Sequence, residues 1–179
     1  MKIGIYEKNF NFRPDIMRDP FQNPFPTSDI ARHAIWEMLV DRDISAFLSA
    51  DWSMVEGDFI AEGFIGVSGN RDPNPDNWRL AFPNLAAYRD EWLKQAQEFA
   101  TGSYGEDPRA AIFTTTTLED IQIEGETALV RKKFDGGIKK ADGSTDPMHW
   151  QTLYYCRLHH GKWKISGFTG YLPNPMGVA

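Results

Sequence analysis

Asp58 is the carboxylate of this chain whose neighbours best suit acid–base chemistry. It precedes Phe59 and Ile60, and an apolar setting would desolvate the carboxylate. Desolvation disfavours the charged form, so it raises the pKa of a carboxyl toward the range in which it acts as a general base. The alternative interpretation of Asp58 is a helix cap or a solvated acid. Its neighbours make it a candidate catalytic residue.

His149 and Tyr154 are two further candidate catalytic residues, near the start and in the middle of an expected strand. A histidine facing a pocket can transfer a proton near neutral pH, and a tyrosine can donate a hydrogen bond to a ligand carbonyl. The alternatives are a histidine at a strand end beside the Asp146-Pro147 turn and a tyrosine packed in the core. The two residues are five positions apart, so they share a face only if the strand contains a β-bulge.

The sequence predicts neither a metal site nor an organic cofactor. His159-His160 falls at an expected hairpin turn, where adjacent side chains point apart, and no Cys or His spacing typical of a zinc site occurs elsewhere. Cys156 is the single cysteine, which excludes an intramolecular disulfide. It lies among leucines and tyrosines, so we expect a buried structural thiol; catalytic use would need a nearby base.

The net charge of −6 argues against a nucleic-acid partner. Nucleic-acid binders normally carry a basic patch that displaces counterions from phosphates. The longest basic clusters here, Arg131-Lys132-Lys133 and Lys139-Lys140, are interpreted as solvated charge. Met1–Lys8 lacks the apolar stretch of a signal peptide, and no segment is long and apolar enough to span a bilayer. We therefore expect a cytoplasmic protein with no membrane partner.

The length of 179 residues fits one domain with terminal extensions. We expect the domain over residues 27–173, preceded by an arm over 1–26 and followed by a tail over 174–179. Prolines break any helix in the arm, and phenylalanines give it apolar surface to bury. These residues are Pro14, Pro20, Pro24 and Pro26, and Phe10, Phe12, Phe21 and Phe25. The arm either lies as a strap over its own domain or wraps a second subunit.

Helical patterns fill the first half of the chain. Thr27-Ser28-Asp29 consists of good N-cap residues and precedes apolar positions at helical spacing. Asp41-Arg42-Asp43 is predicted to interrupt this helix, with Asp43 capping a short second one. Asn84 is predicted to cap a long third helix with an apolar stripe. We expect the three helices over residues 29–39, 44–48 and 85–99.

Strand patterns follow Pro108. The β-branched run Thr114–Thr117 favours an extended backbone. Asp135-Gly136-Gly137, Asp142-Gly143-Ser144 and His160-Gly161 have the composition of turns. We expect four strands over residues 111–123, 127–134, 150–158 and 163–172. Their short connections predict an antiparallel meander.

The third of these strands favours a homodimer. Its side chains alternate between two faces, and neither face is clearly polar. One face carries Trp150, Thr152, Tyr154, Cys156 and Leu158, and the other carries Gln151, Leu153, Tyr155 and Arg157. A sheet covered by helices on one side should have a polar open face. A second subunit on the open face resolves this discrepancy.

The order of elements resembles the nuclear transport factor 2-like superfamily, over roughly residues 28–172. The segment Asp43–Asp51 is similar to the second helix of that superfamily, followed by the junction Ala50-Asp51-Trp52. Gly161–Ile165 with Phe168 is similar to its closing hairpin. The superfamily includes ketosteroid isomerases, scytalone dehydratase, limonene epoxide hydrolase and SnoaL-like polyketide cyclases. The resemblance implies an α+β fold in which a curved antiparallel sheet wraps around N-terminal helices and forms a cone with an internal pocket.

The resemblance also implies where a catalytic base would lie. In the isomerases, a general-base aspartate follows the second helix. The matching stretch here is Met54-Val55-Glu56-Gly57-Asp58, with Gly57 nearest the catalytic position and Asp58 beside it. No match to the isomerase oxyanion-hole pair or to the hydrolase's Asp-Arg-Asp set is found.

Aromatic residues are the expected ligand-binding lining of the cone, because large apolar rings suit a flat ligand as well as a core. They are Trp52, Phe59, Phe64, Trp78, Trp92, Trp150 and Phe168. The expected function is binding of a small apolar or aromatic molecule. The resemblance implies its isomerisation, dehydration or cyclisation by acid–base chemistry. The alternative is a non-catalytic binding or assembly module that recruits a protein through the open sheet face.

Overall fold

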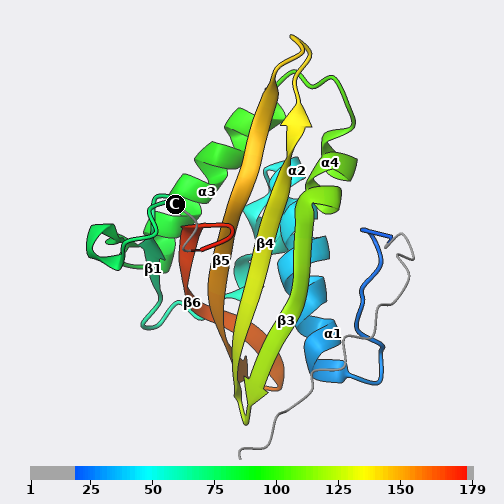
Figure 1. Cartoon of the computed structure of the whole chain (residues 1–179). Coiled ribbons are helices and arrows are strands. Elements are labelled where there is room, and N and C mark those ends of the chain that lie inside the picture. Colours follow the sequence, from blue (N-terminus) through cyan, green and yellow to red (C-terminus); the bar gives the residue numbers. More distant parts are fainter. Residues whose placement is uncertain (1–18, 177–179) are drawn as a thin grey trace, which may run out of the picture.

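The computed structural model describes residues 19–176, which form helices packed on one curved sheet (Figure 1). The helical elements are α1 (Ile30–Trp36), the π-helical segment η1 (Glu37–Arg42), α2 (Asp43–Ser49), the single turns η2 (Trp52–Met54), η3 (Glu56–Asp58) and η4 (Pro75–Asn77), α3 (Leu85–Ala100) and α4 (Pro108–Thr115). The strands are β1 (Ile65–Ser68), β2 (Arg79–Phe82), β3 (Thr116–Glu124), β4 (Thr127–Lys139), β5 (Thr145–His159) and β6 (Lys162–Pro173).

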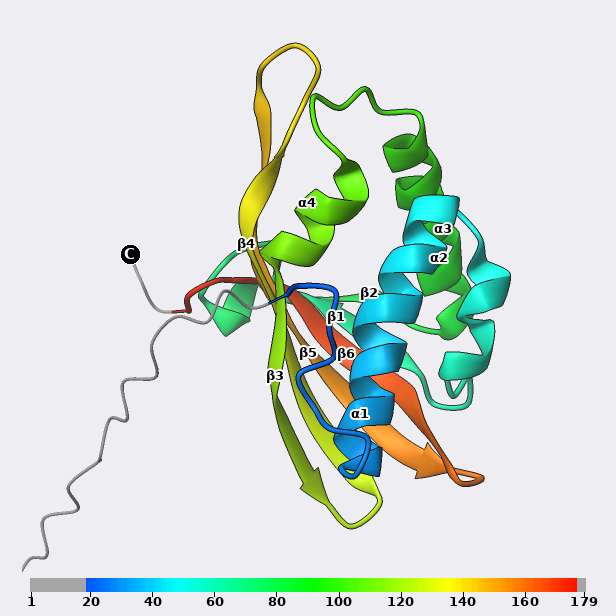
Figure 2. The same ribbon diagram turned by 90° about the vertical axis from the view of Figure 1, so that its right-hand side faces the viewer.

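The strands form a single sheet in the order β2-β1-β6-β5-β4-β3. Strands β3 to β6 are the predicted antiparallel meander, β1 lies parallel to β6, and β2 pairs antiparallel with β1. The four α-helices all lie on one side of the sheet (Figure 2). The predicted α+β fold, with a curved open sheet wrapped around helices, is confirmed.

The predicted helix break at Asp41-Arg42-Asp43 is wrong. Asp43 has helical dihedral angles (φ −61°, ψ −47°), and its backbone N–H donates to the carbonyl of Val40, so it is not an N-cap. The helix continues through the π-helical turn and ends at Ala50, which takes a left-handed conformation (φ 50°). The three charged residues do not break the helix, because Arg42 and Asp43 find ion-pair partners on other elements.

The predicted strand over residues 111–123 begins too early, because residues up to Thr115 belong to α4. Asp107 accepts a hydrogen bond from the Arg109 backbone N–H (3.1 Å), and Pro108 occupies the first turn, where its missing N–H has no cost. The hydroxyls of Thr115 and Thr116 donate to the carbonyl of Ile112. Capping and burial of this helix override the extended preference of the threonine run.

The predicted turn at Asp135-Gly136-Gly137 is also wrong, because β4 continues to Lys139 and β5 begins at Thr145. Gly136 has φ 151°, and a Cβ there would lie 2.5 Å from the Thr115 methyl carbon. Glycine therefore serves here to let the strand pass over α4. The turn lies at Asp142-Gly143-Ser144, and the longer hairpin extends the sheet beyond α4.

Residues 19–26 lie against the helices of the same chain. The Phe21 ring is 4.8 Å from that of Phe113, Phe25 packs on the core, and the Asn23 amide donates to Glu37 Oε1 (2.8 Å). Phe10, Phe12 and Pro14 of the expected arm lie outside the described residues.

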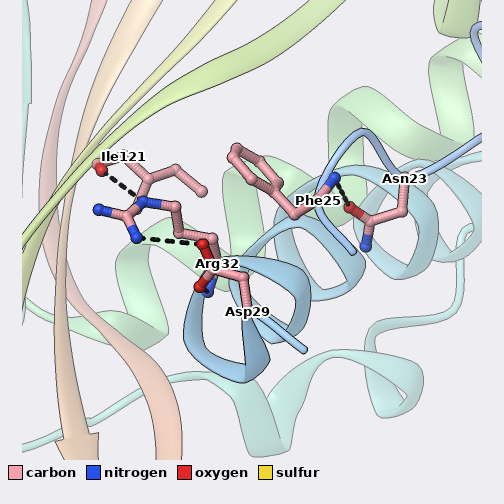
Figure 3. A network of polar contacts seen from close by, with 5 residues as sticks. All are labelled: Asn23, Phe25, Asp29, Arg32 and Ile121. Carbon is pink, nitrogen blue, oxygen red and sulfur yellow. Dashed lines mark hydrogen bonds and ion pairs between the residues drawn. The ribbon is translucent and has the colours of Figure 1, made fainter. Parts of the chain in front are cut away.

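Polar contacts hold the start of α1 in place (Figure 3). The Asn23 side-chain oxygen accepts a hydrogen bond from the backbone N–H of Phe25 (3.1 Å). Asp29 caps α1 and pairs with the Arg32 guanidinium (3.1 Å), whose Nε donates to the carbonyl of Ile121 in β3 (3.1 Å). These bonds fix α1 against the edge of the sheet.

Candidate functional site

A cavity of about 480 Å³ lies between the helices and the sheet. Helices α2, α3 and α4 contribute one side of it, and β4, β5 and β6 contribute the other. Its apolar lining consists of Ile44, Phe47, Trp92, Phe99, Ile112, Phe134, Ile138, Pro147, Met148, Trp150 and Phe168. Its polar lining consists of Asp43, Arg71, Tyr88, Gln95, Lys132, Asp146, Thr152, Tyr154 and Tyr171. A mostly apolar cavity of this size with a few polar groups is typical of small-molecule sites.

An ion pair between a buried lysine and a partly exposed aspartate forms part of the cavity lining. Lys132 Nζ lies 2.7 Å from Asp43 Oδ2; the lysine side chain is 2% exposed and the aspartate side chain 26%. The ammonium group also lies 5.3 Å from the centre of the Phe134 ring. The interpretation of Lys132 as solvated charge is therefore wrong. Alternation along β4 places Lys132 on the same face as Val130, which is fully buried.

Two tyrosine hydroxyls face the cavity beside this ion pair. Neither Tyr88 nor Tyr154 makes a side-chain hydrogen bond to another residue within 19–176. Burial raises the pKa of both phenols well above the ordinary value of 10.0, and the negative charge of Asp43 acts in the same direction. Both groups therefore stay protonated at neutral pH and can donate a hydrogen bond to a ligand oxygen.

A second polar group lies where the cavity opens to solvent. Arg71 is exposed, and its guanidinium lies 5.3 Å from the centre of the Trp150 ring. The Tyr171 hydroxyl donates to Gln95 Oε1 (3.2 Å), which joins β6 to α3. The opening therefore combines one cation with aromatic and amide groups.

Four of the residues predicted for the site line the cavity: Tyr154, Trp92, Trp150 and Phe168. Trp52, Phe59 and Phe64 do not; they belong to an aromatic cluster with Tyr88 in the core. Trp78 also lies outside the lining, and its indole N–H donates to the carbonyl of Asp72 (2.9 Å). The aromatic pattern thus contains both lining and packing residues.

Asp58 and His149 lie outside the cavity lining. The Asp58 carboxylate accepts two hydrogen bonds from the Arg42 guanidinium, at 2.7 and 2.8 Å. His149 is 54% exposed, and its Nδ1 lies 3.0 Å from Asp135 Oδ1. β5 pairs with β4 in continuous register from Thr145 to Arg157, so His149 and Tyr154 are on opposite faces. The structure does not bring these three candidates together.

The sequence contained weak signals for the residues that were missed. Asp43 follows Leu39 by four positions and precedes Phe47 by four, which places it on the apolar stripe of its helix. Lys132 shares strand parity with Val130. Asp43 and Lys132 therefore occupy positions at which the helical stripe and the strand alternation predict apolar residues.

The arrangement shows no metal-binding geometry. Within residues 19–176, no group of three or more His, Cys, Asp or Glu side chains is placed to hold a metal ion. In the same range, no helix has the length and apolar character needed to cross a membrane.

Comparisons with known proteins identify the fold. No protein-family model matches the sequence, and no curated protein matches it. A nuclear transport factor 2-like protein of unknown function from Shewanella baltica is similar in structure, with 15% identity and a TM-score of 0.50 over 83% of this chain and 97% of that chain. A nuclear transport factor 2-like protein with a cystatin-like fold from Novosphingobium aromaticivorans has 13% identity and a TM-score of 0.50, over 84% and 85% of the two chains. A third such protein, from Pseudomonas putida, has 14% identity and a TM-score of 0.50, over 76% and 82%. The chain thus has the nuclear transport factor 2-like, cystatin-like fold.

Proposed function

We propose that this protein binds a small, largely apolar molecule in the cavity and acts on it by proton transfer. The observation that carries the proposal is the ion pair of Asp43 with the buried Lys132, beside two tyrosine hydroxyls that have no side-chain hydrogen bond within residues 19–176. Burying an ion pair costs desolvation free energy, and an apolar pair of similar volume is often equally stable. Retention of such a pair in a cavity lining favours a role in chemistry over a role in stability.

The three kinds of group suit abstraction of a proton next to a carbonyl. Asp43 Oδ2 is held by Lys132, whereas Oδ1 accepts no side-chain hydrogen bond within the described residues and is free to take a proton. The electron pair of the broken C–H bond moves onto the carbonyl oxygen and forms an enolate. Tyr88 and Tyr154, both protonated, donate hydrogen bonds to that oxygen as its charge develops. Return of the proton to another carbon gives isomerisation, and loss of a β-hydroxyl gives dehydration.

Exchange of a ketone's α-hydrogens with solvent tests this proposal without knowledge of the natural substrate. 1-Tetralone is a flat bicyclic ketone that is small enough for the cavity. We expect the protein to accelerate deuterium uptake from D₂O above the buffer rate, as followed by proton NMR. Asp43→Asn should reduce the acceleration to background, whereas Asp58→Asn should retain it. Equal rates for the wild type and Asp43→Asn would contradict the proposal.

The alternative function is a non-catalytic module that uses the open sheet face. An ionisable pair inside the cavity supports the enzyme instead, since a binding module has no need of a buried charge there. We also propose that the open face forms a homodimer, because it carries Leu153 and Tyr155, the latter 41% exposed. Tyr155→Glu should then halve the mass measured by sedimentation at micromolar concentration. A monomeric wild type would contradict the dimer.

A further inference from the structure

In the part of the chain that the structure describes, two cations line the cavity, Lys132 and Arg71, and only Lys132 forms an ion pair. Lys132 pairs with Asp43, and the lining carboxylate Asp146 pairs with Lys140 at 3.0 Å. Arg71 forms no ion pair and donates no side-chain hydrogen bond within the described residues. In a chain of net charge −6, this leaves one unneutralised guanidinium at the cavity opening.

The backbone holds Arg71 in an uncommon conformation. Asn70 and Arg71 have φ of 47° and 60°, in the left-handed region that residues other than glycine rarely adopt. Tyr171, which lies beside them just past the end of the β1–β6 pairing, has φ of 53°. The Arg71 backbone N–H donates to the carbonyl of Tyr171 (2.6 Å), so the two strained segments support each other. Such strain persists where the surrounding structure fixes it, and it concentrates at functional sites.

The side-chain environment of Arg71 leaves its N–H donors available. The guanidinium lies over the Trp150 ring, whose other contacts include Phe134 (4.7 Å) and Tyr171 (6.4 Å). Because its neighbours fix the Trp150 ring in place, the stacked guanidinium is fixed as well. Stacking leaves the N–H groups at the edge of the guanidinium free to donate hydrogen bonds. Arg71 is therefore oriented to bind an acceptor group at the opening of the cavity.

We propose that the ligand of this cavity is a flat, apolar molecule that carries a carboxylate, and that Arg71 binds this carboxylate at the opening. The inference rests on the proposed function, because it assigns a chemical class to the same ligand. A planar guanidinium matches a carboxylate with two parallel hydrogen bonds. A phosphate would call for more than one unpaired cation, and Arg71 is the single one in the described lining. The rings of the ligand extend inward toward Tyr88 and Tyr154.

Two probes of equal shape and different charge test the inference. 2-Naphthoate and 2-naphthamide share the same ring system, and only the first carries a carboxylate. Their dissociation constants are measured by ligand-observed NMR titration at neutral pH. We expect the wild type to bind naphthoate about tenfold more tightly than naphthamide, which is the size of effect typical of a charge-assisted pair.

Variants test whether Arg71 causes the tighter binding of naphthoate. Arg71→Gln should remove the tenfold ratio, and Arg71→Lys should restore part of it, since the charge returns without the planar fork. Arg89→Gln is the matched control: Arg89 lies on the solvent side of α3, paired with Asp90, and its loss changes net charge equally. This control should keep the wild-type ratio. Circular dichroism checks that each variant is folded.

The outcomes separate the inference from the proposed function. Equal affinities of the wild type for the two probes, or an unchanged ratio in Arg71→Gln, overturn the carboxylate assignment while cavity binding stands. A ratio that falls equally in Arg89→Gln also overturns it, because the preference would then reflect net charge alone. Failure of both probes to bind overturns the proposed function and the inference together.

Discussion

Arg42 and Asp43 are neighbours on one helix, yet they form two very different ion pairs. Arg42 points to Asp58 in the turn η3, and the two side chains are 40% and 15% exposed. Asp43 points to Lys132 in β4, and these two side chains are 26% and 2% exposed. The pairs differ in their cation, which is partly exposed in the first pair and buried in the second, and only the second pair lines the cavity. Consecutive residues of a helix face different directions, which allows adjacent charges to serve two regions.

The two ion pairs have different roles: the Arg42–Asp58 pair supports the fold, and the Asp43–Lys132 pair supplies charged groups to the cavity. The Arg42–Asp58 pair has two short hydrogen bonds and fixes the turn after α2. The Arg42 side chain is 40% exposed, so its cation keeps much of its hydration and the pair contributes modestly to stability. The Lys132 ammonium is buried in a mostly apolar lining, where desolvation of an ion costs several kcal/mol, whereas the Asp43 side chain is 26% exposed. The structure retains the pair beside Tyr88 and Tyr154, where a proton acceptor is useful.

Lys132→Met should have the largest effect on stability. Removal of the ammonium leaves the Asp43 carboxylate without its partner. Breaking a buried pair costs about 3–5 kcal/mol, and we expect the lower end of this range because the Asp43 side chain is 26% exposed. Urea denaturation followed by tryptophan fluorescence measures the loss in the free energy of unfolding.

The double variant Asp43→Leu/Lys132→Met is the control. With both charges replaced by apolar side chains, stability should recover to the wild-type value or above it. Proton exchange of 1-tetralone should remain absent. If Lys132→Met lost only about 1 kcal/mol of unfolding free energy, as expected for an exposed pair, Lys132 would not be a desolvated charge.

Stability at high pH tests whether water is excluded from the buried Cys156 thiol. Burial raises the pKa of the Cys156 thiol from 9.0 to about 12. Between these values the unfolded chain loses the thiol proton and the folded chain keeps it. The stabilisation is therefore complete below pH 9 and is lost as pH rises toward 12, by about 2 kcal/mol at pH 10.5.

Denaturation of the wild type and Cys156→Ala between pH 8 and 11 isolates this effect from the ionisation of tyrosines. The difference in free energy of unfolding between the two proteins should shrink as pH rises. A difference that is constant with pH would show that water reaches the thiol, and it would weaken the case that Lys132 is desolvated.

Asp58→Asn should have a smaller effect than Lys132→Met, of about 1 kcal/mol, because the Arg42–Asp58 pair is partly exposed. The loss should diminish in 1 M NaCl, since salt screens exposed charges more than buried ones. Urea denaturation at low and high salt measures both quantities. A loss above about 3 kcal/mol would place Asp58 among the buried charges and remove the contrast with Asp43.

The sequence predicted the fold better than the site, for a physical reason. Element order and turn composition are local, and they sufficed for the long helix α3, the order of the four meander strands and the α+β class. Asp43 and Lys132 are 89 residues apart, and each was interpreted from its neighbours alone, as a cap and as solvated charge. A charge on an apolar stripe indicates burial only once its partner is known. The helix α4 was missed likewise, because its burial against β4 outweighs local propensity.

Tyr88→Phe and Tyr154→Phe should have the smallest effects on stability, within about 0.5 kcal/mol, because neither hydroxyl has a hydrogen-bond partner to lose among residues 19–176. Tyr171→Phe is the matched control and should lose about 1 kcal/mol, since its hydroxyl bonds to Gln95. The order of the three variants is the opposite for the exchange rate. Removal of the Tyr88 or Tyr154 hydroxyl should slow 1-tetralone exchange about 100-fold, as for loss of one oxyanion donor. Urea denaturation of the three variants measures their stabilities, and proton NMR measures their rates of 1-tetralone exchange. Variants at Tyr88 and Tyr154 that lose stability but keep the exchange rate would assign these phenols to packing, which would leave Asp43 without the donors that its chemistry requires.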